Sequence, residues 1–173
     1  MNYFMKKEWM KYSFRKYNKN YPQWFNQEKN QLIKSFKPEI KSFNIEHVGS
    51  TAIPGLGGKG IIDIAILVKR EKYLLAKKKV LYLGYLQWKV PSWKKRLSFK
   101  KYPKQGKRYN LHLTYDLREF KKMIFFRNFL IKNPEILKEY KSLKQKAAKT
   151  SKNHGQTYRD FKAPFIKSIN RRM

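Results

Sequence analysis

Apolar residues recur along this chain with two different periods, and each period indicates a different kind of element. Residues 22–36 carry aromatic and aliphatic side chains at helical spacing, which predicts a first helix with a polar outer face. Residues 43–48 have an extended pattern. Residues 61–68 are nearly all apolar and rich in β-branched side chains, with Asp63 as the single acid, which is typical of a central strand covered on both faces.

The middle of the chain continues this alternation without a repeat or a low-complexity linker. Residues 71–83 have helical periodicity and end at Gly84. The next predicted strands are residues 85–90, 93–102 and 108–115, with residues 103–107 as a basic hairpin tip. Along the last of these strands His112 shares one face with Asn110 and Thr114. That face is polar and is expected to turn toward a site.

Helical segments close the chain. One covers residues 118–131, and the next begins with Asn133 as its cap and Pro134 as its first helical residue. The last carries apolar residues from 158 to 169, with Pro164 as its start or as a kink. A sheet with helices packed on it defines an α/β (α+β) fold, and 173 residues suit one domain spanning residues 1–173.

Charge changes this picture more than any other property of the composition. Lys and Arg total 42 against 11 Asp and Glu, which gives a formal net charge of +31. A surface of this kind attracts polyanions, so RNA or DNA is the expected partner. A genome rich in A and T also inflates Lys, Tyr and Phe without any function, but it does not explain the scarcity of carboxylates.

The absence of two features from the sequence narrows the expected cellular location and the possible kinds of metal site. The chain has no Cys, so neither disulfides nor a thiolate-held metal is available to it. No run of about 18 apolar residues is present, and the first 20 residues lack an apolar signal core. We therefore expect a cytoplasmic protein with no membrane partner.

The candidate chemistry lies between residues 46 and 63. A strand that ends in Gly49-Ser50 and opens a short helical turn presents backbone amides and a small hydroxyl where a phosphate can sit. Glycines at 55, 57, 58 and 60 allow a tight return into the next strand, which places Asp63 beside the Gly49-Ser50 turn. An acid there can hold Mg²⁺ on the phosphates, or it can simply accept hydrogen bonds from the turn.

The same segment carries a family resemblance. Residues 45–68 resemble the signature of the GrpB family, a branch of the nucleotidyltransferase superfamily, and ordered matches extend the resemblance over residues 17–170. They include residues 110–113 on a strand, residues 126–130 on a helix, and Lys144, Tyr158 and Lys162 in the helical tail.

The resemblance implies a nucleotidyltransferase-like mixed sheet with packed helices and a helical C-terminal tail. It also implies a Gly-Ser turn over a triphosphate and acids that hold Mg²⁺. The superfamily's acids come as an Asp-x-Asp pair, because two metals stabilise the attacking and leaving oxygens. This chain has Ala65 at the second position, which puts that two-metal chemistry in doubt and leaves Glu46 and His112 as the other candidate ligands or bases.

The resemblance also selects candidate nucleotide contacts beyond the turn. Gly49, Ser50 and Lys59 are expected to meet phosphates, and Arg127, Tyr158 and Lys162 are expected to position the nucleotide. Each has a plainer interpretation, since a Gly-Ser pair also starts helices, one Lys among many is often only solvated, and the aromatic residues near Tyr158 also fit a core. His47 flanks the end of a strand and is interpreted as a structural hydrogen-bonding residue.

Two classes of function remain open. In the first, an enzyme transfers a nucleotide, AMP from ATP, to an RNA acceptor such as a tRNA 3′ end, with Asp63, Glu46 or His112 as the base. In the second, the fold has lost its chemistry and binds RNA or nucleotides, which the missing acid at residue 65 explains directly. The aromatic residues interleaved with cations in this part of the chain are then expected to stack bases, or half of them belong to the core; they are Trp88, Trp93, Phe99 and Tyr102. A kinase is disfavoured, because the chain lacks a Gly-x-x-x-x-Gly-Lys-Ser/Thr loop.

Overall fold

The apolar segment at residues 61–68 forms a strand inside a five-stranded sheet. In the computed structural model, which describes residues 14–37, 43–88, 95–103, 107–151 and 154–173, the strand order is β1-β2-β5-β4-β3. The strands are β1 (Phe43–Val48), β2 (Ile61–Val68), β3 (Leu86–Trp88), β4 (Arg96–Lys101) and β5 (Arg108–Thr114). Only the β2–β5 pair is parallel among these strands, so the sheet is mixed.

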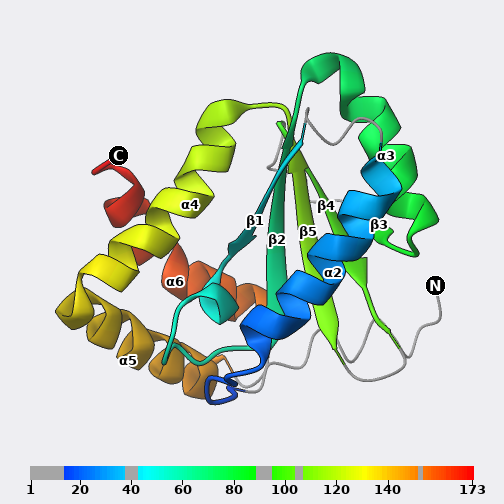
Figure 1. The fold of residues 1–173 in the computed structure, drawn as a ribbon. Helices are drawn as coiled ribbons and strands as arrows, with labels where there is room; N and C mark the ends of the chain where they lie inside the picture. Colours follow the sequence, from blue (N-terminus) through cyan, green and yellow to red (C-terminus); the bar gives the residue numbers. More distant parts are fainter. Residues whose placement is uncertain (1–13, 38–42, 89–94, 104–106, 152–153) are drawn as a thin grey trace.

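Helices cover both faces of this sheet (Figure 1). They are α2 (Tyr21–Phe36), α3 (Tyr73–Tyr82), α4 (Leu117–Lys132), α5 (Pro134–Thr150) and α6 (Gly155–Asn170), with short 3-10 turns η2 (Ser50–Ala52) and η3 (Arg70–Lys72). The helices α2 and α3 lie on one face, and α4, α5 and α6 lie on the other. The fold is therefore a mixed α/β sheet with packed helices and a helical C-terminal tail, as the sequence predicted.

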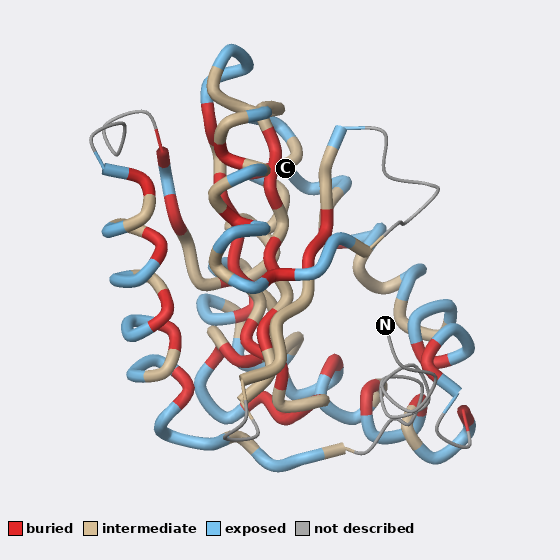
Figure 2. Tube along the Cα trace, turned by 90° about the vertical axis from the view of Figure 1, so that its right-hand side faces the viewer, coloured by how far each residue is buried: buried red, intermediate tan, exposed pale blue. Residues whose placement is uncertain are grey.

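The two faces of the sheet differ in chemistry because β-strand side chains alternate between faces. On the face covered by α2 and α3, the strands contribute a continuous apolar core, which includes Ile64, Ile66, Leu111 and Phe99. On the opposite face, α4 packs Phe120 against Val48 and Ala65. Figure 2 shows largely buried strands and outer helices that alternate between buried and exposed residues. The polar side chains of β2 and β5 are on the α4 side.

Most boundaries agree with the sequence analysis. The helix predicted at residues 22–36 is α2, and the extended segments at 43–48, 61–68 and 108–115 are β1, β2 and β5. Of the other two predicted strands, β3 begins one residue later than predicted and β4 ends one residue earlier, and residues 89–90, 93–94 and 104–106 lie outside the described residues. The connection across 103–107 does join antiparallel neighbours, β4 and β5, as a hairpin does.

Two details at helix ends differ from the sequence interpretation. Asn133 occupies the cap position of α5, but its side chain makes no cap bond there and instead donates to the carbonyl oxygen of Phe129 at 2.7 Å. Pro164 does not start the last helix, because α6 begins nine residues earlier at Gly155 and Pro164 lies inside it. Within the described residues, no helix has both the length and the apolar character needed to cross a bilayer.

Candidate functional site around Asp63

Asp63 lies directly against the Gly49-Ser50 turn. Val48, the last residue of β1, is opposite Asp63 in the β1–β2 register, so the chain turns at Gly49 beside the carboxylate. Gly49 has φ 69° and ψ −167°, and a Cβ atom there would lie 2.3 Å from Asp63 Oδ2. Thr51 anchors the turn to β2 by donating to the Ile61 carbonyl oxygen at 3.1 Å. The adjacency that the glycines predicted is therefore confirmed.

Strand β5 supplies the groups on the other side of Asp63. Asn110 Nδ2 donates to Asp63 Oδ1 at 2.9 Å, and His112 Nε2 lies 3.8 Å from the same oxygen. Ser98 Oγ on β4 is 3.2 Å from His112 Nδ1. Burial lowers the pKa of His112, so the imidazole is neutral near pH 7. The predicted polar face of residues 110–114 thus meets Asp63.

Glu46 and Arg127 are paired with each other near this centre. Glu46 is opposite Ala65 on the same face of the sheet, and Arg127 on α4 donates from Nη1 to Glu46 Oε2 at 2.8 Å and to the His47 carbonyl oxygen at 2.6 Å. An arginine that holds a carboxylate and a carbonyl at once fastens α4 to β1. Glu46 and Arg127 therefore connect two elements, and the catalytic role expected of Glu46 and the nucleotide-positioning role expected of Arg127 stay predictions.

His47 points to the opposite face from Asp63 and has a structural environment. Its ring stacks on Phe25 with centroids 4.6 Å apart, and its Nε2 is 3.0 Å from Thr51 Oγ1. The Thr51 hydroxyl donates its hydrogen to Ile61, so His47 Nε2–H must donate to Thr51. Burial lowers the pKa of His47 to about 4. This neutral donor supports the turn, in agreement with the sequence interpretation.

Lysines from the glycine loop and from α6 converge on the same centre. The ammonium groups of Lys59 and Lys162 lie 5.3 Å and 4.2 Å from the centroid of the Tyr158 ring. Tyr158 is 2% exposed, so its ring contacts cations in the interior and is not an open surface for a base. Burial lowers the pKa of each of these two lysines to about 8, and each also interacts with Asp63.

A third lysine, Lys144 on α5, reaches the glycine loop at Gly57. Its Nζ donates to the carbonyl oxygen of Gly57, and its side chain is 2% exposed. A Cβ atom built on Gly58 would lie 2.8 Å from Lys144 Nζ and 2.7 Å from Ser50 Oγ, so both groups approach the same glycine. Burial and the nearby Lys162 hold the pKa of Lys144 well below its usual range.

The site role of Lys144 was missed in the sequence. Its signal was a lysine on the buried stripe of a helix, beside Tyr140 and Ala147. A chain with 42 basic residues hides such a signal, because one more lysine attracts no notice. In the sequence analysis Lys144 was named only as one of the residues that match the GrpB family pattern.

Strand β4 adds a cation and distinguishes between the two interpretations of Phe99. Lys100 faces the site, with its Nζ 3.2 Å from the centroid of Trp88, and burial together with Arg159 and Lys59 lowers its pKa to about 7. Phe99 is fully buried in the core on the opposite face, so of its two interpretations the core residue is confirmed and base stacking is excluded. Trp93 lies outside the described residues.

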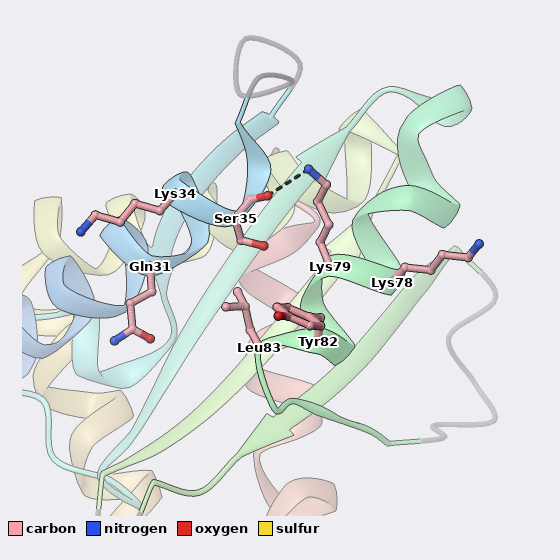
Figure 3. Close-up of a pocket in the computed structure, with 7 residues that line it drawn as sticks. All are labelled: Gln31, Lys34, Ser35, Lys78, Lys79, Tyr82 and Leu83. Atoms are coloured by element: carbon pink, nitrogen blue, oxygen red, sulfur yellow. Dashed lines mark hydrogen bonds between the residues drawn. The ribbon is translucent and has the colours of Figure 1, made fainter.

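A groove between α2 and α3, on the other side of the sheet, is the alternative location for a ligand (Figure 3). Its lining residues are Gln31, Lys34, Ser35, Lys78, Lys79, Tyr82 and Leu83. Lys34 and Lys78 point away from one another in Figure 3, and Lys79 Nζ donates to the Ser35 carbonyl oxygen at 2.9 Å. Polar groups do not converge there as they do at Asp63, so the sheet face under α4 to α6 is the stronger candidate site.

Comparison with known proteins places this geometry in a family. The model of the GrpB protein family matches residues 12–172. The UPF0157 protein BH1888 of Halalkalibacterium halodurans is 31% identical over 161 residues, which cover 90% of this chain and 79% of the relative. The UPF0157 protein YqkA of Bacillus subtilis is 29% identical over 157 residues, and the chain spans only 44% of its length.

Solved structures agree with this placement. Conserved protein GrpB from Enterococcus faecalis superposes with a TM-score of 0.79 at 27% identity, covering 92% of this chain and 96% of that chain. The GLD-2/RNP-8 complex superposes with a TM-score of 0.51 at 13% identity, covering 79% of this chain and 56% of that chain. At this identity the similarity shows a shared fold and nothing more. The chain therefore belongs to the GrpB family, and its mixed α/β fold is shared with the GrpB structure and, at the level of the fold alone, with the GLD-2/RNP-8 complex.

Proposed function

We propose that this protein binds a nucleoside triphosphate by its phosphate chain at the face of the sheet around Asp63, and that RNA is its macromolecular partner. The observation that carries this proposal is that Lys59, Lys144 and Lys162 all interact with Asp63 beside the Gly49-Ser50 turn, with Lys144 Nζ and Ser50 Oγ approaching the same glycine. The three lysines come from a loop and from two different helices, so the fold itself brings them together.

Buried ammonium groups need compensation. Charged side chains removed from water are tolerated when they are paired, and like charges held together repel. Here Lys59 and Lys162 contact one tyrosine ring, and Lys144 interacts unfavourably with Lys162. A chain of phosphates supplies several negative charges in a row and several acceptor oxygens. It is therefore the ligand that suits this arrangement best.

The net charge supports RNA as the partner. A formal net charge of +31 exceeds what one small anionic ligand requires, whereas phosphate neutralisation along a nucleic acid grows with the number of Lys and Arg contacts. A tRNA is our choice of RNA and ATP our choice of nucleotide, the former for its 3′ end and the latter for its abundance.

Transfer of the nucleotide to RNA is a second candidate function, favoured by the position of Asp63. Its Oδ1 is held by Asn110, while its Oδ2 faces the Gly49-Ser50 turn. In this reaction an RNA hydroxyl oxygen attacks the α-phosphorus, the bond from that phosphorus to the bridging oxygen breaks, and pyrophosphate leaves. The proton of the hydroxyl passes to Asp63, with the neutral His112 3.8 Å away as the next acceptor.

Binding is tested first with a fluorescent ATP analogue and the Lys162→Gln variant. Loss of one charge-assisted contact is expected to weaken binding roughly tenfold to a hundredfold. Lys167→Gln is the matched control, because Lys167 lies exposed on the same helix and its loss removes the same charge. Equal affinities of the two variants would refute the phosphate site, and thermal unfolding of both checks that they fold.

Transfer is tested with tRNAs that end at successive 3′ positions and each labelled nucleoside triphosphate in turn. Growth of one tRNA end by one nucleotide, lost in Asp63→Ala with RNA binding retained, would establish an RNA nucleotidyltransferase. Nucleotide and RNA binding without any extension would leave binding as the function. Extension by Asp63→Ala at the normal rate would remove Asp63 from the mechanism.

A further inference from the structure

The oxygen ligands around Asp63 do not suit a divalent metal. Mg²⁺ requires close to octahedral oxygen coordination, and two-metal transfer uses at least two carboxylates at adjacent positions. Here Ala65 takes the second position, and Glu46 on the same face is bonded to Arg127 at 2.8 Å. No group of three His, Cys, Asp or Glu among the described residues is arranged to hold a metal ion. The donor set therefore disagrees with the metal site that the superfamily implies.

Ammonium groups occupy the surroundings of Asp63 instead. Lys59, Lys144 and Lys162 all interact electrostatically with this carboxylate. After burial, Lys59 lowers the pKa of Lys162, and Lys162 lowers the pKa of Lys144. Lys144 Nζ and Ser50 Oγ approach the same glycine, Gly58, so one ammonium lies at the phosphate turn itself. Three cations thus surround one carboxylate in this part of the described structure.

This charge balance determines which form of a nucleotide fits. Free ATP presents the full charge of its phosphates to the lysines, whereas Mg²⁺ neutralises two of those charges and adds a cation to a site that already repels cations. Among the described residues, Asp63 is the one carboxylate that interacts with all three ammonium groups, so its single negative charge is already outweighed before a metal ion is added. The metal-bound nucleotide is consequently the weaker ligand on electrostatic grounds.

We infer that the site takes the phosphate chain of a nucleotide as the free, metal-free anion, with the ammonium groups of Lys59, Lys144 and Lys162 in the role that metal ions have elsewhere in the superfamily. This inference rests on the proposed function, because it concerns the same site and the same ligand. It adds a specific expectation: divalent metal is unnecessary for binding and opposes it.

Titration of the full-length protein with ATP, at constant ionic strength, tests this directly. One arm contains EDTA, and the other contains enough MgCl₂ to convert ATP to its magnesium complex. We expect binding in EDTA, and weakening by roughly threefold to thirtyfold when Mg²⁺ is present. Binding that requires Mg²⁺, or that Mg²⁺ tightens, would overturn the inference and leave the proposed function standing. No binding in either arm would refute the proposed function itself.

The Asp63→Asn variant separates the two roles of this residue. If Asp63 repels the phosphates of the free anion, removal of its charge tightens ATP binding in EDTA by roughly threefold or more. If Asp63 is a metal ligand, the same change weakens binding in Mg²⁺. The amide oxygen of Asn can still accept from Asn110, which protects the local structure. Asp160→Asn is the control for net charge, because Asp160 lies exposed on α6 and is expected to change the affinity little.

Discussion

At the scale of single residues, Gly49 is the position where backbone conformation and available space restrict the residue type most strongly. Its φ of 69° with ψ of −167° falls in a region that is essentially restricted to glycine, and the space where a Cβ atom would go is occupied by the Asp63 carboxylate. The turn and the acid are therefore one unit. A substitution at this glycine disturbs the conformation of the Gly49-Ser50 turn and the position of Asp63 together.

Gly49→Ala is accordingly expected to lose about 3 kcal/mol of unfolding free energy, and nucleotide binding with it. Gly55→Ala is the matched control. Gly55 also has a positive φ, 75°, but a Cβ atom there meets nothing within 4 Å, so only about 1 kcal/mol is expected. Urea unfolding of the two variants measures the difference, and equal losses would show that the contact with Asp63 is unimportant.

His47 is expected to make the stability of the fold sensitive to acid. Burial lowers its pKa from 6.5 to about 4, against the opposing influence of Asp63 and Glu46. The unfolded chain therefore binds this proton more readily than the folded chain. The contribution of His47 to the free energy of unfolding is therefore complete above about pH 6.5 and is lost as the pH drops toward 4. Its size is on the order of 2 kcal/mol after allowance for partial exposure.

Urea unfolding at pH 6.5, 5 and 4 measures this loss. In His47→Gln the pH slope should decrease, because the titrating group is gone, although His112 titrates in the same direction and leaves a residual slope. His154→Gln removes an exposed histidine at the cap of α6 and should keep the slope of the parent protein. A slope unchanged in His47→Gln would mean that His47 is accessible to protons in the folded state.

At the scale of elements, Arg127 joins α4 to the edge strand of the sheet. Its guanidinium is held by a side chain and a backbone carbonyl from adjacent residues of β1, so the whole helix is docked at one point. Helix α4 in turn covers Ala65 and forms one wall of the site. The docking contact therefore acts on the site through the position of α4, without touching a ligand.

We expect Glu46→Gln to lower the unfolding free energy by about 1 to 2 kcal/mol while ATP affinity changes less than about threefold. The reason is that Arg127 loses a charged partner inside a half-buried contact, but Lys59, Lys144 and Lys162 keep their positions. Glu119→Gln on α4, which breaks a surface pair with Lys122, should cost less than about 0.5 kcal/mol. Unfolding and ATP titration measure both. A large loss of ATP binding in Glu46→Gln would restore a direct role for this acid.

Most elements of the fold could be predicted from the sequence because local patterns determine them. The apolar run of β2 and the helical spacing of α2 are signals within single segments, and the alternation around His112 identified its face correctly. The contacts that define the site are of another kind. Arg127 bonds to Glu46 across 81 positions, and Lys144 reaches Gly57 across 87, so no local pattern reveals either.

For the same reason, the sequence anticipated that several candidate residues lie together but not which groups each of them contacts. Gly49, Asp63 and His112 do lie together, which the glycine spacing and the strand pattern anticipated. Tyr158 is near them but buried, since a 3.6-residue period places it on the inner face of α6 without saying what touches it. The ammonium groups of two candidate lysines, Lys59 and Lys162, lie over that ring, a contact that depends on tertiary packing alone.

At the scale of the whole molecule, charge is distributed far beyond the site. Three lysines around Asp63 account for a small part of a net charge of +31, and exposed basic residues occur on every helix that the structure describes. A surface of this kind exerts its effect over about one Debye length, roughly 8 Å at physiological ionic strength. RNA binding and nucleotide binding should consequently respond to salt in different ways.

We expect the affinity for a tRNA to fall by roughly 10³-fold to 10⁵-fold between 50 and 200 mM salt, because about six to ten phosphates release their counterions when they meet the surface. ATP carries at most about four charges, so its affinity should fall far less over the same range. Filter binding for tRNA and fluorescence titration for ATP, in one buffer series, measure the two slopes.

The Lys162→Gln variant makes this comparison specific. If the surface governs RNA binding and the interior lysines govern nucleotide binding, the variant lowers ATP affinity at every salt concentration while the slope for tRNA stays within about one unit of the parent value. If the two salt slopes are equal in the parent protein, RNA contacts no more of the positive charge than ATP does, and the many surface lysines have no role in RNA binding.

Duplex DNA added as competitor at the higher salt then decides whether the surface recognises RNA or polyanions in general, because duplex DNA presents phosphates without the single-stranded end that the site would need to reach.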